Sequence, residues 1–378
     1  MGNPAVRLAV PLLTAAALLA APWLAGATVH VVRTGESIQA AVSTARPGDT
    51  VLVKPGLYAA APGRRSVVSV TTDDLTLIGS LGAVIDASGA DYGVLVGPDL
   101  APHRQGCPTQ PAVTRFRMRG FTLQRAAEAG ARLVGVEHYR LSHAVYLENG
   151  AHGASALCSR HGRIDHNFAS DHAGASIHAD GIETLRADHN IVKNSGLGIE
   201  IANSLNAVVH DNWITGNSGG VLVIARAGQP LPFTENVSVE HNWIAENNRP
   251  DASGELPVGT GILNIGGDDV LIRENTVIGN ASFGVASFGN PSGALDPRIE
   301  PFVDGLVVKR NIVKRNGNEP DTARLATPAA DLIFVPDVLD FATGHRVATD
   351  PDPTDNCFSD NHIDSDLPSG ITSRFECP

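Results

Sequence analysis

The chain has 378 residues, with 28 lysines and arginines against 40 aspartates and glutamates, and a formal net charge of −12 at pH 7. An acidic surface argues against nucleic acid as a partner, and also against simple charge attraction to an anionic polysaccharide. The length is large for one compact core but ordinary for a solenoid, which grows along a single axis.

Residues 1–27 are predicted to be a secretory signal peptide. Arg7 is their only charge, residues 8–21 are nearly all apolar, and the segment ends in a small-x-small cleavage motif. The mature chain would begin near Thr28 and be secreted or periplasmic. A membrane anchor is the alternative, but the apolar stretch is short for one, and no later stretch could span a bilayer.

Residues 28–58 are predicted to form an N-terminal cap with the first strands. Apolar residues recur at helical spacing over Ser37–Ala45, and Pro47-Gly48-Asp49 ends that helix before a strand at 50–53. A solenoid needs such a cap to shield its first turn from water and from edge pairing.

Short alternating apolar runs, each with a glycine or asparagine at its corner, follow with a period in the low twenties. That pattern is typical of a β-solenoid, whose coils bury their apolar faces only by stacking. We predict this body over residues 59–316, and an irregular coil and cap over 317–378. Asparagines turned inward at the corners are predicted to bond to the coils on either side, at positions Asn167, Asn190, Asn212, Asn242, Asn275 and Asn311.

The four cysteines of an exported chain predict two disulfides. We pair Cys107 with Cys158, because both would lie in insertions that leave the same edge of the solenoid. Cys357 and Cys377 would then pin the C-terminal cap.

Three segments, Gly198–Ser204, Asn217–Val223 and Gly259–Ile262, resemble secreted bacterial parallel β-helix proteins of the pectin-lyase-like superfamily. The likeness covers roughly residues 30–320. It implies an all-β fold: a right-handed parallel β-helix with three strands per coil and a short N-terminal capping helix. It also implies polysaccharide lyases, epimerases or glycoside hydrolases as the class of activity.

Alternation along the strands places every second side chain on the outer face, and adjacent rungs lie about 4.8 Å apart. Aligning the coils at their corner glycines predicts one outward cluster that we take as the candidate catalytic residues: Tyr146, Glu148, His178 and Glu200. A tyrosine or histidine there could abstract a proton beside a uronate carboxyl, or two carboxylates could serve hydrolysis. The alternative is that these outward polar residues are only solvated.

Residues near this cluster indicate which kind of glycan it would bind. A lyase needs a cation beside the substrate carboxylate, and Arg186 and Arg226 are the nearest candidates in sequence. Further along the same face the outward residues turn apolar, so that a neutral or partly esterified glycan would suit Leu222 and Leu263.

A second polar ladder precedes the corner asparagines, and it includes Asp165, Asp188 and His210, with histidines beside them. Carboxylates and imidazoles on neighbouring rungs could bind a divalent metal, or they could form Asp–His hydrogen bonds on a solvated face. Trp213 and Trp243, which each follow a corner asparagine, are predicted to stack on each other.

Together with the signal peptide and the outward cluster, the resemblance implies a secreted carbohydrate-active protein, and the sequence leaves open whether it is an enzyme. Its partner would be a polysaccharide or cell-surface glycan, with calcium as the cofactor that a highly charged glycan would require. The alternatives are a non-catalytic carbohydrate-binding or scaffold protein, and a periplasmic metal-handling β-helix protein. We expect a monomer with no nucleic-acid partner.

Overall fold

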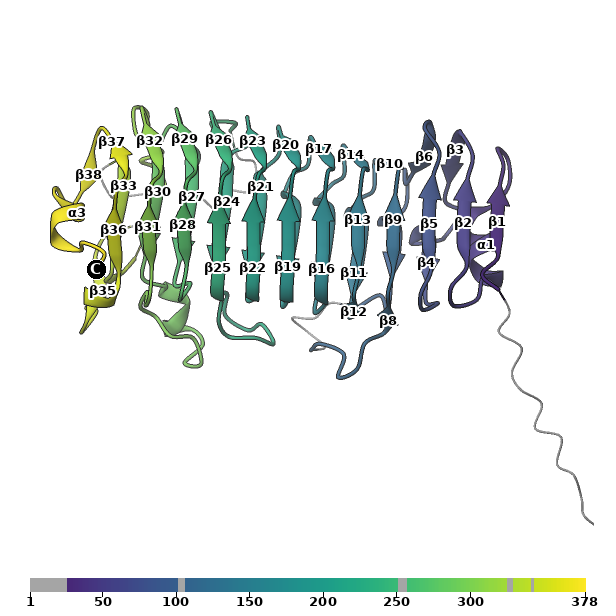
Figure 1. The fold of residues 1–378 in the computed structure, drawn as a ribbon, viewed down its shortest axis with the longest axis horizontal. Coiled ribbons are helices and arrows are strands. Elements are labelled where there is room, and N and C mark those ends of the chain that lie inside the picture. Colours follow the sequence, from purple (N-terminus) through teal and green to yellow (C-terminus); the bar gives the residue numbers. More distant parts are fainter. Residues whose placement is uncertain (1–25, 101–105, 251–256, 325–328, 341–342) are drawn as a thin grey trace, which may run out of the picture.

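The computed structural model describes residues 26–100, 106–250, 257–324, 329–340 and 343–378, so the predicted signal peptide lies almost wholly outside the described residues. The chain winds into an elongated parallel β-helix in which three strands form each coil (Figure 1). Within the described residues, no helix is long and apolar enough to cross a membrane.

Three parallel sheets, which we call A, B and C in the order in which each coil visits them, run the length of the molecule. Sheet A contains β1 (Val29–Val32), β2 (Thr50–Val53), β5 (Thr76–Gly79), β9 (Arg117–Arg119), β13 (Arg140–Ser142), β16 (Arg160–Asp165), β19 (Glu183–Asp188), β22 (Leu205–His210), β25 (Glu235–Glu240), β28 (Leu271–Arg273), β31 (Val307–Lys309) and β36 (Cys357–Ser359), with β8 (Val113–Thr114) and β12 (Val136–Glu137) beside them.

Sheet B contains β3 (Gly56–Ala59), β6 (Ala83–Asp86), β10 (Thr122–Gln124), β14 (Val145–Leu147), β17 (Phe168–Ser170), β20 (Ile191–Lys193), β23 (Trp213–Thr215), β26 (Trp243–Ala245), β29 (Thr276–Ile278), β32 (Ile312–Lys314) and β37 (His362–Ile363). Sheet C contains β4 (Ser66–Val70), β7 (Tyr92–Val96), β11 (Ala129–Val134), β15 (His152–Leu157), β18 (Ala175–Asp180), β21 (Leu197–Ala202), β24 (Gly219–Ile224), β27 (Thr260–Ile265), β30 (Phe283–Phe288), β33 (Ala330–Val335) and β38 (Asp366–Leu367).

Short elements close the two ends. The predicted capping helix is α1 (Ile38–Thr44), whose N-terminus is capped by the Ser37 hydroxyl accepting from the Ala40 N–H at 3.2 Å. The other end carries the hairpin of β34 (Val338–Leu339) and β35 (Arg346–Ala348), the 3-10 turn η2 (Pro353–Asp355) and helix α3 (Ile371–Arg374). A further 3-10 turn, η1 (Pro291–Ala294), lies in the segment between β30 and β31. Strand pairing continues past residue 316, because β33, β36, β37 and β38 pair with the coil before them.

Two ladders of buried polar groups hold the coils together. At the corner between sheets A and B, the Asn212 Oδ1 accepts from the Asn190 backbone N–H at 2.9 Å and from its Nδ2 at 3.0 Å. The pattern repeats along the predicted corner asparagines, so their structural role is confirmed. A second ladder, which runs through Asn217, Asn247 and Asn280, lies at the corner between sheets B and C.

Both predicted disulfides are present, and no described cysteine is free. The bond between Cys107 and Cys158 ties the insertion before β8 to the coil of β15. The bond between Cys357 and Cys377 fastens the C-terminal segment to β36. The predicted tryptophan stack is also present, with the rings of Trp213 and Trp243 5.2 Å apart at an interplanar angle of 15°.

Candidate active site on the outer face of sheet C

His178 and Glu200 lie side by side on the outer face of sheet C. They are opposite each other in the register of β18 and β21. Both point outward, because side chains alternate along a strand and their neighbours Ile177 and Ile199 are buried in the core. Glu200 is 6% exposed and His178 is half-buried, so both groups sit in a partly desolvated surface. The predicted adjacency of these two residues is confirmed.

Tyr146 does not join them, and that part of the prediction is wrong. Its strand, β14, belongs to sheet B, whereas the sheet C strand of the same coil is β15. The Tyr146 side chain points into the core, is 1% exposed and has a hydroxyl without a hydrogen-bond partner among the described residues. Burial raises the pKa of this phenol well above its ordinary value, so it is no proton donor or acceptor for a substrate at the surface.

Glu148 also lies apart from the predicted cluster. It follows β14 at the corner between sheets B and C, in the left-handed region at φ 51°. There it lines a second depression, together with Asp171 and Arg249. The predicted position of Glu148 is wrong for the same reason as that of Tyr146: matching the coils by their corner glycines placed β14 on sheet C, whereas it belongs to sheet B.

Strand β15 supplies residues that the sequence reasoning missed. Ser155 is opposite His178 in the register, and its hydroxyl lies 3.1 Å from His178 Nδ1. The ring of His152 stacks on that of His178 with centroids 4.3 Å apart and an interplanar angle of 6°. One rung further, Arg132 of β11 is opposite Ser155, and its Nε is buried without a hydrogen-bond partner among the described residues.

One of the two predicted cations is in place and the other is not. Arg226, just after β24, forms an ion pair with Glu200. Its backbone is fixed by Asn203, whose Nδ2 donates to the Arg226 carbonyl at 2.9 Å and whose Oδ1 accepts from the Arg226 N–H at 3.0 Å. Arg186 lies on sheet A instead, where its Nε donates to Asp188 at 3.2 Å.

The buried setting shifts the protonation of three groups. Burial, aided by the charges of Arg226 and Arg132, holds the pKa of His178 well below its ordinary value. Burial likewise lowers the pKa of His152. Asp180, at the end of β18, is affected in the opposite direction, because burial and the nearby Glu200 carboxylate raise its pKa to about 7. At neutral pH the site therefore offers uncharged imidazoles beside a carboxyl group that holds a proton about half of the time.

A groove of about 410 Å³ lies over these strands, and neither Asp180 nor Arg132 is among its lining residues. Its floor is made by β15, β18, β21 and the start of β24, and its walls include His152, His178, Glu200 and Arg226. The sequence reasoning expected the apolar residues beyond Glu200 to be exposed to a glycan. That expectation is wrong, because Leu222 and Leu263 are 0% and 3% exposed beneath later segments of the chain.

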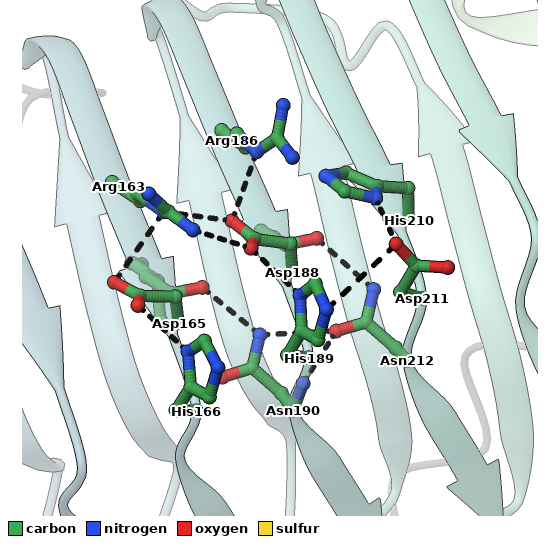
Figure 2. A network of polar contacts seen from close by, with 12 residues as sticks. Arg163, Asp165, His166, Arg186, Asp188, His189, Asn190, His210, Asp211 and Asn212 are labelled. Carbon is green, nitrogen blue, oxygen red and sulfur yellow. Dashed lines mark hydrogen bonds and ion pairs between the residues drawn. The ribbon is translucent and has the colours of Figure 1, made fainter.

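The Asp–His ladder of sheet A is a separate network (Figure 2). Asp188 is fully buried and accepts from Arg163 Nη2 at 2.7 Å, and its Oδ2 lies 2.9 Å from His189 Nδ1. Asp165 is bonded in the same way by Arg140 and His166. Of the two interpretations of this ladder, hydrogen bonding accounts for its geometry. Among the described residues, no group of three or more His, Cys, Asp or Glu side chains could hold a metal ion.

Comparisons with known proteins agree on the fold. Residues 112–277 match the family model described as "Right handed beta helix region", which gives the hand of the solenoid. An alginate lyase from Paenibacillus sp. str. FPU-7 superposes with a TM-score of 0.51 at 13% identity, over 81% of this chain and 97% of that one. The Azotobacter vinelandii mannuronan C-5 epimerase AlgE6 A-module superposes with a TM-score of 0.52 at 16% identity, over 86% and 89%. No curated protein matches in sequence. At these identities the likeness shows the fold alone.

Proposed function

Because the chain is a right-handed parallel β-helix with a polar groove on its outer face, we propose that it is a secreted carbohydrate-active enzyme of the lyase or epimerase type. The observation that carries the proposal is the cluster itself: two stacked imidazoles of lowered pKa and the ion pair of Glu200 with Arg226 line one groove, and Asp180, with a pKa of about 7, lies two residues beyond His178 on β18. Perturbed titratable groups that converge in a groove mark functional sites more often than chance.

The substrate that suits this cluster is a glycan that contains uronate sugars. Arg226 lines the groove together with His178 and is ion-paired with Glu200. A guanidinium carries five N–H donors, so a substrate carboxylate can bind Arg226 beside Glu200. Its negative charge would also favour a protonated imidazole, and would so raise the basicity of His178 when substrate is bound.

The groups can then share the steps of a β-elimination. When His178 Nδ1–H donates to Ser155, the Nε2 lone pair is free to take the proton from the carbon next to the uronate carboxylate. The electron pair of that C–H bond forms a carbon–carbon double bond, and the bond to the leaving oxygen breaks. Asp180, protonated, gives its proton to that oxygen. In an epimerase the carbanion would be reprotonated from the opposite face instead.

Calcium has no evident place in this scheme. Glu200, the carboxylate at the centre of the groove, is already ion-paired with Arg226. No group of three or more candidate ligands occurs among the described residues. The donor set thus does not fit a bound calcium ion, and we write no step through one.

Hydrolysis is the second candidate, and the different surroundings of two carboxyl groups favour it. Asp180 has a pKa of about 7 and suits a general acid, whereas Glu200 is held by an arginine. They are one rung and two residues apart in the register of β18 and β21.

One experiment tests the proposal and separates its forms. The mature protein is incubated with a panel of uronate-containing and neutral polysaccharides, with and without calcium. Ultraviolet absorbance of unsaturated uronates reports elimination, NMR reports epimerisation, and new reducing ends without absorbance report hydrolysis. His178→Ala and Asp180→Asn should abolish turnover while the circular dichroism spectrum stays that of the wild type, whereas His143→Ala, just after β13 of sheet A, should leave turnover intact. Binding without turnover on every glycan, unaffected by these changes, would favour a non-catalytic scaffold.

A further inference from the structure

The groove is closed toward the C-terminal end of the solenoid. From β24 onward, side chains that point outward from sheet C are apolar and almost inaccessible, and they form a second core: Leu222, Ile224, Leu263, Ile265, Phe288 and Ile333. Since these residues face away from the main core, later segments must cover them. Segments 225–234 and 290–302 are tied together at this place, because Asn290 Nδ2 donates to the Ala225 carbonyl at 2.7 Å. Arg298 also donates to the Gln229 carbonyl, at 3.1 Å.

The groove is also closed toward the N-terminal end. Tyr92, Leu95 and Ala129, on the outer face of β7 and β11, form a small buried cluster of their own. Arg132 covers the ring of Tyr92, with its guanidinium carbon 5.5 Å from the ring centroid, and donates to the Leu100 carbonyl at 3.4 Å. Among the described residues, the groove is lined by β15, β18, β21 and the first residue of β24, Gly219, and three rung spacings make about 14 Å.

On the described part of the chain, the groove adjoins a second depression across the corner between sheets B and C. The groove of about 410 Å³ and the neighbouring depression of about 320 Å³ share four small residues at this corner: Gly150, Ala173, Gly196 and Ser218. The far side of the depression carries an exposed cation, Arg249, whose backbone N–H donates to the Asn217 carbonyl at 3.0 Å. The two hollows therefore adjoin each other between His178 and Arg249.

We propose that the glycan crosses the β-helix along a path through these two hollows, perpendicular to the solenoid axis, and that Arg249 binds a second uronate carboxylate beyond the corner. This inference rests on the proposed function, because it uses the same groove and the same class of substrate. The small corner residues let a sugar ring pass where a larger side chain would obstruct it. Arg249 sets specificity at a distance and takes no part in the chemical steps.

The test uses uronate oligosaccharides of increasing length and two variants that leave the cluster intact. Arg249→Gln should raise KM about tenfold for substrates long enough to reach the depression, with kcat unchanged, and should leave the shortest substrate unaffected. Ala173→Leu, at an exposed corner position, should weaken the same long substrates. Ala59→Leu, at an exposed alanine of β3, is the matched control and should change nothing.

The outcomes separate this inference from the proposed function. If the wild-type protein turns over these substrates and both variants behave like Ala59→Leu at every length, the crosswise path is wrong while the proposed function stands. If no glycan is turned over, the proposed function fails, and calorimetric titration of the long oligosaccharide still decides the path. Binding that Arg249→Gln weakens about tenfold supports it, whereas unchanged or absent binding overturns it.

Discussion

Asn212 offers a direct measure of what the corner ladder contributes to stability. Its side chain is 2% exposed and makes four hydrogen bonds. Asn212→Ala leaves the Asn190 backbone N–H and the Ala187 carbonyl buried without the side chain that satisfies them. Each unsatisfied buried group costs about 1–3 kcal/mol, so the free energy of unfolding should fall by about 2–6 kcal/mol.

Urea unfolding followed by far-ultraviolet circular dichroism measures this loss, and fluorescence of the adjacent Trp213 reports whether the same coils melt first. Asn318→Ala is the control, because Asn318 is exposed and its Nδ2 donates only to the Arg315 carbonyl at 2.9 Å. It should cost less than about 1 kcal/mol. Equal, small losses for the two variants would refute the argument that the ladder holds the coils together.

Three further outcomes are expected. Tyr146→Phe removes a buried hydroxyl that has no hydrogen-bond partner among the described residues, so the free energy of unfolding should stay the same or rise by about 1 kcal/mol. Any glycan turnover should persist, and its loss would show that Tyr146 belongs to the active site. Asp180 has a folded pKa of about 7 against an ordinary 3.8, so the folded state binds the proton more tightly, and stability falls as pH rises from about 4 to about 7 and then levels off. Asp180→Asn should remove that fall in melting temperature, and a pH profile identical to wild type would count against it. Ile199→Asp should unfold the middle coils, because an isolated buried charge costs several kcal/mol, whereas Glu200→Gln should keep the wild-type circular dichroism spectrum.

The sequence predicted the coil but misjudged one of its three sides. Periodicity is enough to identify stacked coils and their corner asparagines, because each coil must repeat the groups that its neighbours bond to. It does not tell a sheet B strand from a sheet C strand, since both are short alternating runs after a polar corner. Matching by the corner glycine therefore pairs Tyr146 of β14, a sheet B strand, with β18, a sheet C strand, which is an offset of about a third of a coil.

A stricter use of the period would have found the missing residues. The corner asparagines Asn167 and Asn190 are 23 residues apart, and the same step back from His178 leads to Ser155 and then to Arg132. The cover over Leu222 was beyond reach from the sequence, because it depends on where loops of irregular length fold back. The same holds for the raised pKa of Asp180, which follows from burial and from Glu200 one rung away.

The insertions have a consequence for how such a protein can change over time. Coils of 22 or 23 residues make the floor of the groove, whereas the long segments after β24, β26 and β30 leave the strands only at their ends. Each coil presents the same asparagine contacts to the coils above and below, so the floor tolerates change poorly. A loop can be lengthened or exchanged at little cost to the stack, because closing a longer loop adds only about 0.6 kcal/mol per doubling. New substrate preferences would therefore arise by exchange of loops around an inherited floor.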